Sequence, residues 1–151
     1  ELHHSPIEDS PYNPEFLLEN VGLLNFKDYY PHQLSAGMLQ RVSFARAMMV
    51  NPSILLMDEP LGALDEITRS EMRYEILRLW SQSPRTVVLV THSITEAILM
   101  SDKVAILSSR PGRVLREIEI NLERPRKELI EHSNAFLNYA SQIKTVLSEA
   151  S

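Results

Sequence analysis

The chain reads Leu-Ser-Ala-Gly-Met-Leu-Gln-Arg at residues 34–41 and, soon after, Ile-Leu-Leu-Met-Asp-Glu-Pro at residues 54–60. The first stretch places a serine and a glycine where the spacing of apolar residues predicts the start of a helix. The second is a short apolar run followed by two adjacent carboxylates, and such a run is typical of a buried strand in a parallel sheet. Together the two stretches predict an α/β fold.

A second apolar run at residues 86–90 predicts another buried strand. Between the two runs, Met72, Ile76 and Leu79 recur at helical spacing and predict an amphipathic helix. Because parallel strands need a long crossover connection, residues 54–90 are expected to form a βαβ unit.

Three helix starts are visible in the sequence. Asn13 followed by a proline predicts a short helix over residues 16–23, and Ser35 is expected to cap a longer one. Ser93 and Glu96 form the pattern of a capping box and predict a third helix.

The last third of the chain predicts a hairpin and a helix. Residues 104–107 and 114–120 read as antiparallel strands that turn at residues 110–113. A final helix from about residue 127 should carry one apolar stripe, made of Phe136, Ala140, Ile143 and Leu147.

Composition excludes several classes of function. The net charge of −5 argues against a general nucleic-acid binder. Basic residues do gather late in the chain, but glutamates are mixed among them, so we expect a solvated mixed-charge surface; they are Arg110, Arg113, Arg116, Arg124, Arg126 and Lys127. The chain has no cysteine, no apolar run long enough to span a bilayer and no pattern of a signal peptide. A role at a membrane would therefore come through a partner.

Polar residues follow both predicted strands. Asp58 and Glu59 come directly after the first strand, and His92 follows the second. Ligands of open parallel sheets collect at the carboxyl ends of the strands, where one carboxylate could hold Mg²⁺ and the other a reacting water. The alternatives are that the two acids cap the following turn and that His92 is a buried histidine bonded to a carbonyl group.

Ser35 and Gly37 lie at the predicted start of a helix, where backbone N–H groups and the helix dipole favour an anion such as phosphate. The alternative is an ordinary capped helix, since Ser-x-Gly is a common sequence.

Five motifs in order resemble the second half of an ABC transporter ATPase, and they stand at residues 30–37, 41–47, 55–60, 62–65 and 90–92. The resemblance implies part of a P-loop NTPase fold, with a mostly parallel sheet, flanking helices and a C-terminal hairpin and helix. Residues 109–113 and 123–126 further resemble the branch of importers that serves nitrate, sulfonate, taurine and similar solutes.

The resemblance also implies roles for single residues. Ser35 and Gly37 would belong to the signature motif, which contacts the γ-phosphate of ATP held by the opposite subunit. Asp58 would be the Walker B aspartate that holds Mg²⁺, and Glu59 the general base. Asp65 would lie in the D-loop at the dimer interface, and His92 would be the switch histidine. Each role is one that phosphoryl transfer requires.

The family's phosphate loop, Gly-x-x-x-x-Gly-Lys-Ser/Thr, occurs nowhere in the 151 residues. We therefore expect the chain alone to bind ATP poorly or not at all. In the family, the strand leading into that loop lies beside the strand that corresponds to residues 86–90. Without it an apolar edge is exposed, and we expect self-association or domain swapping.

The resemblance predicts four segments: a loose lead-in at 1–13, part of the helical signature subdomain at 14–50, the Walker B half of the catalytic core at 51–126 and a C-terminal helix at 127–151. In the complete ATPase, ATP and Mg²⁺ would be the cofactors. A second ATPase subunit and a membrane permease would be the partners, on the cytoplasmic face of the membrane.

Two other functions stay open at this stage. One is a non-catalytic or regulatory subunit that supplies the signature motif in trans. The other is an ABC-type protein of DNA repair or translation, although the long coiled coil or basic linker expected of that class is absent.

Overall fold

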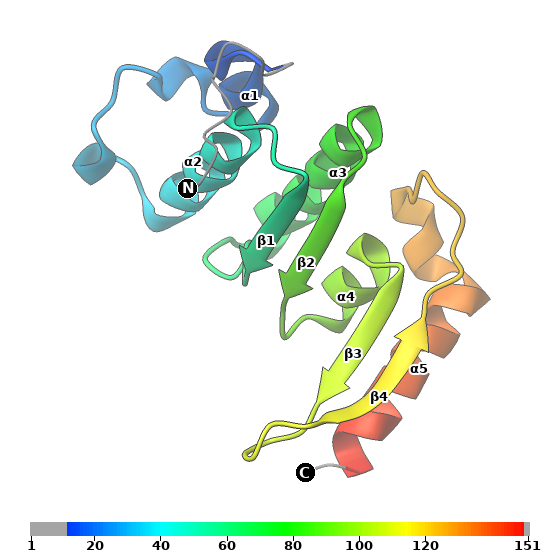
Figure 1. Cartoon of the computed structure of the whole chain (residues 1–151). Helices are drawn as coiled ribbons and strands as arrows, with labels where there is room; N and C mark the ends of the chain where they lie inside the picture. The colour runs from blue at the N-terminus through cyan, green and yellow to red at the C-terminus, as the bar shows by residue number, and fades with distance from the viewer. Residues whose placement is uncertain (1–11, 150–151) are drawn as a thin grey trace. The chain divides into compact units, whose positions relative to one another are not determined.

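The computed structural model describes residues 12–149, which belong to two compact units, Glu1–Val88 and Leu89–Ser151 (Figure 1). The lead-in expected at residues 1–13 lies, up to residue 11, outside the described residues.

The first unit begins with helices that start where the sequence predicts. In α1 (Pro14–Asn20) the side chain of Asn13 accepts a hydrogen bond from the backbone N–H of Phe16 at 2.6 Å. Two single turns of 3₁₀ helix, at Leu24–Phe26 and Pro31–Gln33, lead to α2 (Ala36–Met49). The cap at Asn13 confirms the predicted start of α1.

The expected βαβ unit is present. It consists of β1 (Ile54–Asp58), α3 (Glu66–Gln82) and β2 (Thr86–Val90), and β1 pairs with β2. The arrows of the two strands point the same way in Figure 1, and the N–H of Thr86 donates to the carbonyl of Ser53 at their shared starting end. The pairing is therefore parallel, as predicted.

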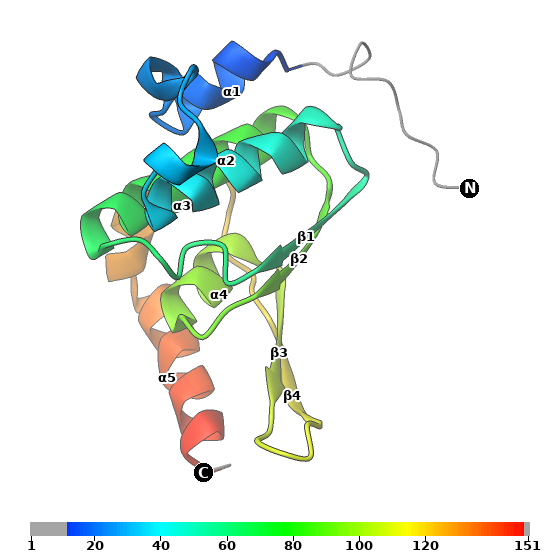
Figure 2. The same ribbon diagram turned by 90° about the vertical axis from the view of Figure 1, so that its left-hand side faces the viewer.

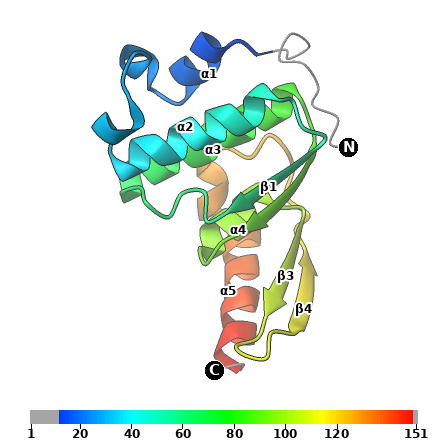
Figure 3. The same ribbon diagram turned by 60° about the vertical axis from the view of Figure 1, so that its left-hand side comes forward.

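Helices α2 and α3 lie on the same side of this sheet (Figures 2 and 3). Leu55 and Met57 of β1 face the two helices and are buried. Ile54 and Leu56 point to the opposite face of the sheet and are 58% and 74% exposed. The prediction of a buried strand is wrong for half of β1, because the helices of the first unit's described residues, 12–88, cover one face of the sheet only. The same alternation leaves Val88 of β2 51% exposed.

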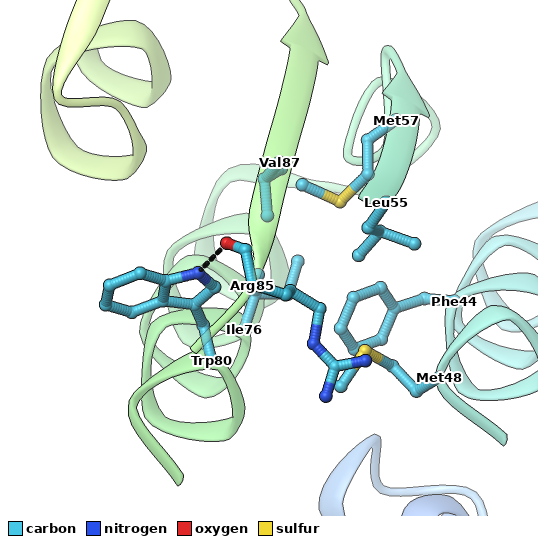
Figure 4. A pocket seen from close by; sticks show the side chains of 8 residues that line it. All are labelled: Phe44, Met48, Leu55, Met57, Ile76, Trp80, Arg85 and Val87. Atoms are coloured by element: carbon cyan, nitrogen blue, oxygen red, sulfur yellow. Dashed lines mark hydrogen bonds between the residues drawn. The ribbon is translucent and has the colours of Figure 1, made fainter. Parts of the chain in front are cut away.

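The core of this unit lies between that covered face and the two helices. Figure 4 shows Phe44 of α2 and Ile76 of α3 converging on Leu55 of β1 around a small apolar cavity of about 10 Å³. At its margin the indole N–H of Trp80 donates to the carbonyl of Arg85 at 2.8 Å. Side chains from α2, α3 and both strands thus close one core, which fixes α2 against the sheet.

The second unit contains α4 (Ile94–Met100), the hairpin of β3 (Lys103–Leu107) and β4 (Val114–Glu119), a 3₁₀ turn (Glu128–His132) and α5 (Asn134–Glu149). The strands pair antiparallel, which confirms the predicted hairpin. Its core gathers apolar side chains from all four main elements, among them Ile98, Ile106, Ile118, Phe136 and Ile143.

The predicted stripe of α5 needs one correction. Phe136 and Ile143 are buried as expected, but Leu147 is 40% exposed and its neighbour Val146 is buried instead. In the last turn of α5 the buried face therefore turns toward Val146, away from the line that Phe136 and Ile143 would extend to Leu147.

Arg126 also departs from the prediction of a solvated basic surface. Its side chain is buried, and its Nη1 group donates to the carbonyls of Ile98, Leu99 and Ser101, at the end of α4. Its Nη2 group reaches the carboxylate of Asp102 at 3.2 Å. Removal from water lowers the pKa of Arg126, with the nearby charge of Arg124 adding to the effect. Donation to the carbonyls that end a helix explains why this charge is tolerated inside.

Candidate functional site

Asp58 ends β1, and Glu59 begins a short loop that ends at Leu64. Asp58 and Glu59 are both exposed to solvent, and Glu59 has a φ of +44°. The carbonyl of Glu59 accepts the N–H of Gly62 at 3.1 Å. A positive φ at a residue with a side chain costs about 1–3 kcal/mol and persists only where the surroundings hold it. The loop is therefore held in a conformation that its sequence alone would not favour.

The start of α2 packs directly against this loop. A methyl group at Gly37 would lie 2.9 Å from Cδ2 of Leu64, so glycine permits a closer approach than any other residue. One turn further along α2, the side chain of Gln40 donates from Nε2 to the carbonyl of Glu59 at 2.8 Å and accepts the N–H of Ala63 at 3.2 Å. Gly37 and Gln40 lie three residues apart and share one face of the helix.

Sequence reasoning did not single out Gln40. The available signal was its position three residues after Gly37, which places both on the face that carries the predicted phosphate contact. Ser35, at the cap of the same helix, is exposed and its Oγ accepts the N–H of Met38 at 3.2 Å. A capping role and a phosphate contact are compatible, because the first turn of a helix has further N–H groups to offer.

Asp65 follows this loop and is the N-cap of α3. Its carboxylate accepts the N–H of Thr68 at 3.1 Å, and this hydrogen bond holds the pKa of Asp65 below its ordinary value. The guanidinium of Arg69 then reaches back to the carbonyls of Leu61 and Leu64, at 3.3 and 2.6 Å. The loop after β1 is thus braced by α3 as well as by α2.

The loop after β2 belongs to the second unit and is arranged differently. The hydroxyl of Thr91 donates to the carboxylate of Glu96 at 2.6 Å and accepts the N–H of Ser93 at 3.0 Å. The Oγ of Ser93 accepts the N–H of Glu96 at 3.3 Å. His92 lies between the two bonded residues and is exposed, so the alternative of a buried histidine is wrong.

Half of the predicted capping box is present. Ser93 caps the helix as expected, but the buried carboxylate of Glu96 binds Thr91 and not the N–H of Ser93. The hydroxyl of Thr91, before His92, is therefore bonded both to Ser93, after His92, and to Glu96 in α4.

Five of the six predicted site residues lie in the first unit, and they are Ser35, Gly37, Asp58, Glu59 and Asp65. Contacts between α2 and the loop after β1 bring the elements that carry them together. His92 is in the second unit, after a strand that pairs with β1. Each unit thus holds a defined part of the predicted site.

Metal chemistry at this site depends on few protein groups. Among residues 12–149, no three acidic or histidine side chains gather as metal ligands. Mg²⁺ commonly takes one or two carboxylates and completes its shell with water and phosphate oxygens. The single exposed carboxylate of Asp58 fits that pattern.

Comparison with known proteins places this geometry in a family. The family model described as ABC transporter matches residues 8–62. An uncharacterized ABC transporter ATP-binding protein of Methanocaldococcus jannaschii is 46% identical over 132 residues, which are 87% of this chain and 48% of that protein. The chain belongs to the ABC transporter family.

A second relative of this ABC transporter chain is the nitrate import ATP-binding protein NrtD of Synechocystis sp., 39% identical over 138 residues, 87% of this chain and 52% of that protein. The dimeric structure of MJ0796, a bacterial ABC transporter cassette, superposes with a TM-score of 0.62 at 36% identity over 71% of this chain and 45% of that one. The resemblance to this family and the partial P-loop NTPase fold are confirmed. The ABC transporter chain spans about half the length of the curated relatives it matches.

None of the helices within residues 12–149 is both long and apolar enough to cross a membrane.

Proposed function

We propose that this chain is the part of an ABC importer ATPase that carries the signature and Walker B motifs, and that it couples ATP binding and hydrolysis to the uptake of a small solute. The observation that carries the proposal is the contact between the start of α2 and the exposed acidic loop after β1. The names of the relatives, which include a nitrate importer, support the class of solute.

The proposed roles follow from the positions of the side chains. Asp58 would bind Mg²⁺, which supplies charge neutralisation on the phosphates when bound. Glu59, exposed beside it, would hold and deprotonate the attacking water. Ser35 and Gly37 would contact the γ-phosphate of ATP bound to a second subunit, and Asp65 would lie at the interface with that subunit. His92 would contact the γ-phosphate in its own subunit.

The complete nucleotide site needs residues outside this sequence. The 151 residues contain no phosphate-loop motif, so the triphosphate would be gripped by another segment or subunit. We propose residues 14–50 as part of the signature subdomain, 51–126 as the Walker B half of the core and 127–151 as a C-terminal helix. The assembly would be a dimer of ATPase subunits bound to a permease, at the cytoplasmic face of a membrane.

The sharpest test of this function is Glu59→Gln in the native assembly, meaning this chain together with the segments that complete its nucleotide site. Loss of the general base should lower kcat for ATP hydrolysis by at least about 100-fold, while ATP binding is kept. Steady-state phosphate release and equilibrium binding of labelled ATP measure the two effects. Glu71→Gln, an exposed glutamate of α3, is the matched control and should leave kcat unchanged. Normal turnover in Glu59→Gln would refute the role of Glu59.

The uncovered face of the β1–β2 sheet supports self-association of the isolated chain. Ile54, Leu56 and Val88 present apolar side chains to solvent on that face. We expect Leu56→Lys to reduce the apparent mass measured by light scattering at high concentration. Ile67→Lys is the control, because Ile67 is 75% exposed but lies on α3. A wild-type chain that stays monomeric at every concentration would contradict this expectation.

A further inference from the structure

Gln40 stands out among the polar side chains that the proposed chemistry does not use. It is half-buried on α2, and its one amide group makes two hydrogen bonds to the main chain of the loop after β1. These bonds reach the two ends of a tight turn, the carbonyl of Glu59 and the N–H of Ala63. A side chain that grips both ends of a turn fixes the distance between them.

The turn that Gln40 grips is the one that sets the direction of the Glu59 side chain. Glu59 adopts a positive φ, which a residue with a side chain rarely does, and its carbonyl accepts a second hydrogen bond from the N–H of Gly62. A methyl group at Gly62 would lie 3.5 Å from Oε2 of Glu59, so the carboxylate folds back over the turn. Any change in the turn would therefore move the carboxylate.

We propose that Gln40 is a positioning residue, whose amide holds the main chain of Glu59 so that its carboxylate is aimed at the reacting water. The inference rests on the proposed function, in which Glu59 is the general base. In this proposal the contact between α2 and the loop affects catalysis, because it orients Glu59. The helix that Ser35 caps and the loop that begins at Glu59 are joined by these hydrogen bonds, so the orientation of the base depends on the placement of α2.

The test compares three variants in the native assembly. Gln40→Met keeps the length of the side chain but makes neither hydrogen bond. Gln40→Glu can still accept the N–H of Ala63, but it offers no donor to the carbonyl of Glu59. Gln82→Met is the matched control, because Gln82 is an exposed glutamine at the end of α3.

We expect Gln40→Met and Gln40→Glu each to lower kcat by about 10- to 100-fold with KM for ATP changed less than about twofold, since misplacement of a catalytic group affects the chemical step. Gln82→Met should behave as wild type. In the 151-residue chain, hydrogen exchange at the amide of Ala63 should accelerate in Gln40→Met and stay slow in Gln40→Glu. Wild-type kcat in either Gln40 variant would overturn the inference.

A double-mutant cycle separates positioning from general stabilisation. If Gln40 acts through Glu59, adding Gln40→Met to Glu59→Gln should not lower the residual turnover further. A further loss of similar size would show that Gln40 acts in another way and would overturn the inference. Absence of hydrolysis in the wild-type assembly would refute the proposed function, and the inference with it. Wild-type hydrolysis with an unaffected Gln40→Met variant would refute the inference alone.

Discussion

The loops after β1 and β2 each carry candidate site residues, and the two loops are held in different ways. The loop after β1 is bonded through its main chain to side chains of α2 and α3, from Gln40 and Arg69. The loop after β2 is bonded through side chains close in sequence, with Thr91 and Ser93 joined to each other and to Glu96 in the first turn of α4. One loop is bonded to a residue far along the chain, Gln40, and the other to residues nearby in the sequence.

The different restraints predict which substitutions should disturb each loop. A change in the packing of α2 or α3 would alter the direction of Glu59, because the restraints cross between elements. Hydrogen bonds around His92 join Thr91, Ser93 and Glu96, so we expect that loop to respond to changes at those three residues. Substitutions at the bonded side chains should therefore act on one loop and leave the other unchanged.

The largest expected effect on stability is that of Glu96→Ala, in the second unit. The carboxylate is buried and accepts the hydroxyl of Thr91, so its removal leaves a cavity and an unpaired hydroxyl. We expect a loss of about 2–3 kcal/mol in the free energy of unfolding, measured by urea denaturation. Hydrogen exchange at the amide of Ser93 should accelerate, and exchange at Ala63 in the other loop should not change.

Two variants control this prediction. Glu96→Gln keeps an oxygen that can accept from Thr91 and should cost less than Glu96→Ala. Glu71→Ala removes an exposed glutamate and should change stability by less than about 0.5 kcal/mol. If Glu96→Ala disturbed Ala63 as much as Ser93, the two loops would not be independent.

A smaller effect is expected from Arg69→Met, in the first unit. This substitution removes the donors to the carbonyls of Leu61 and Leu64, at a half-buried position, and should cost about 1–2 kcal/mol. Exchange at Ala63 should accelerate while Ser93 stays protected, the reverse of the Glu96 pattern. Arg69→Lys keeps the charge but not the planar guanidinium group, so its free energy of unfolding should lie between those of wild type and Arg69→Met. Unchanged exchange at Ala63 would show that α3 does not brace this loop.

The same contrast explains what the sequence could predict. The caps at Asn13 and Ser35 were predicted because a cap and the N–H that it binds lie within three residues. The βαβ unit and the hairpin were predicted because apolar period and turn residues are also local signals. In the loop after β2 the cap at Ser93 was predicted correctly, but the predicted partner of the Glu96 carboxylate was wrong.

Contacts between distant residues could not be predicted. Gln40 meets its partners 19 and 23 residues further along the chain, and no pattern in the sequence marks that pairing. The sequence predicts a solvated surface at Arg126 because charged residues surround it in the chain. Its burial depends on hydrogen bonds to the carbonyls of Ile98 and Leu99 near the end of α4, which are distant in the sequence. The exposed face of β1 was missed for the same reason, because composition reports how apolar a strand is and not what covers it.

The smallest effect is expected at Asp65, where the loop after β1 has a local restraint of the kind found after β2. Its hydrogen bond from the N–H of Thr68 lowers the pKa, so the folded state favours the charged form. A depressed carboxyl pKa stabilises the protein above the unfolded-state pKa, and that stabilisation is lost as the pH falls through the lower, folded value. Asp65→Ala should therefore lower the urea midpoint at pH 7, and its difference from wild type should shrink below about pH 4.

Asp65→Asn keeps a capping oxygen that does not titrate, so its midpoint should exceed that of Asp65→Ala at every pH. A difference between Asp65→Ala and wild type that is independent of pH would show that the charge of Asp65 adds nothing to its cap.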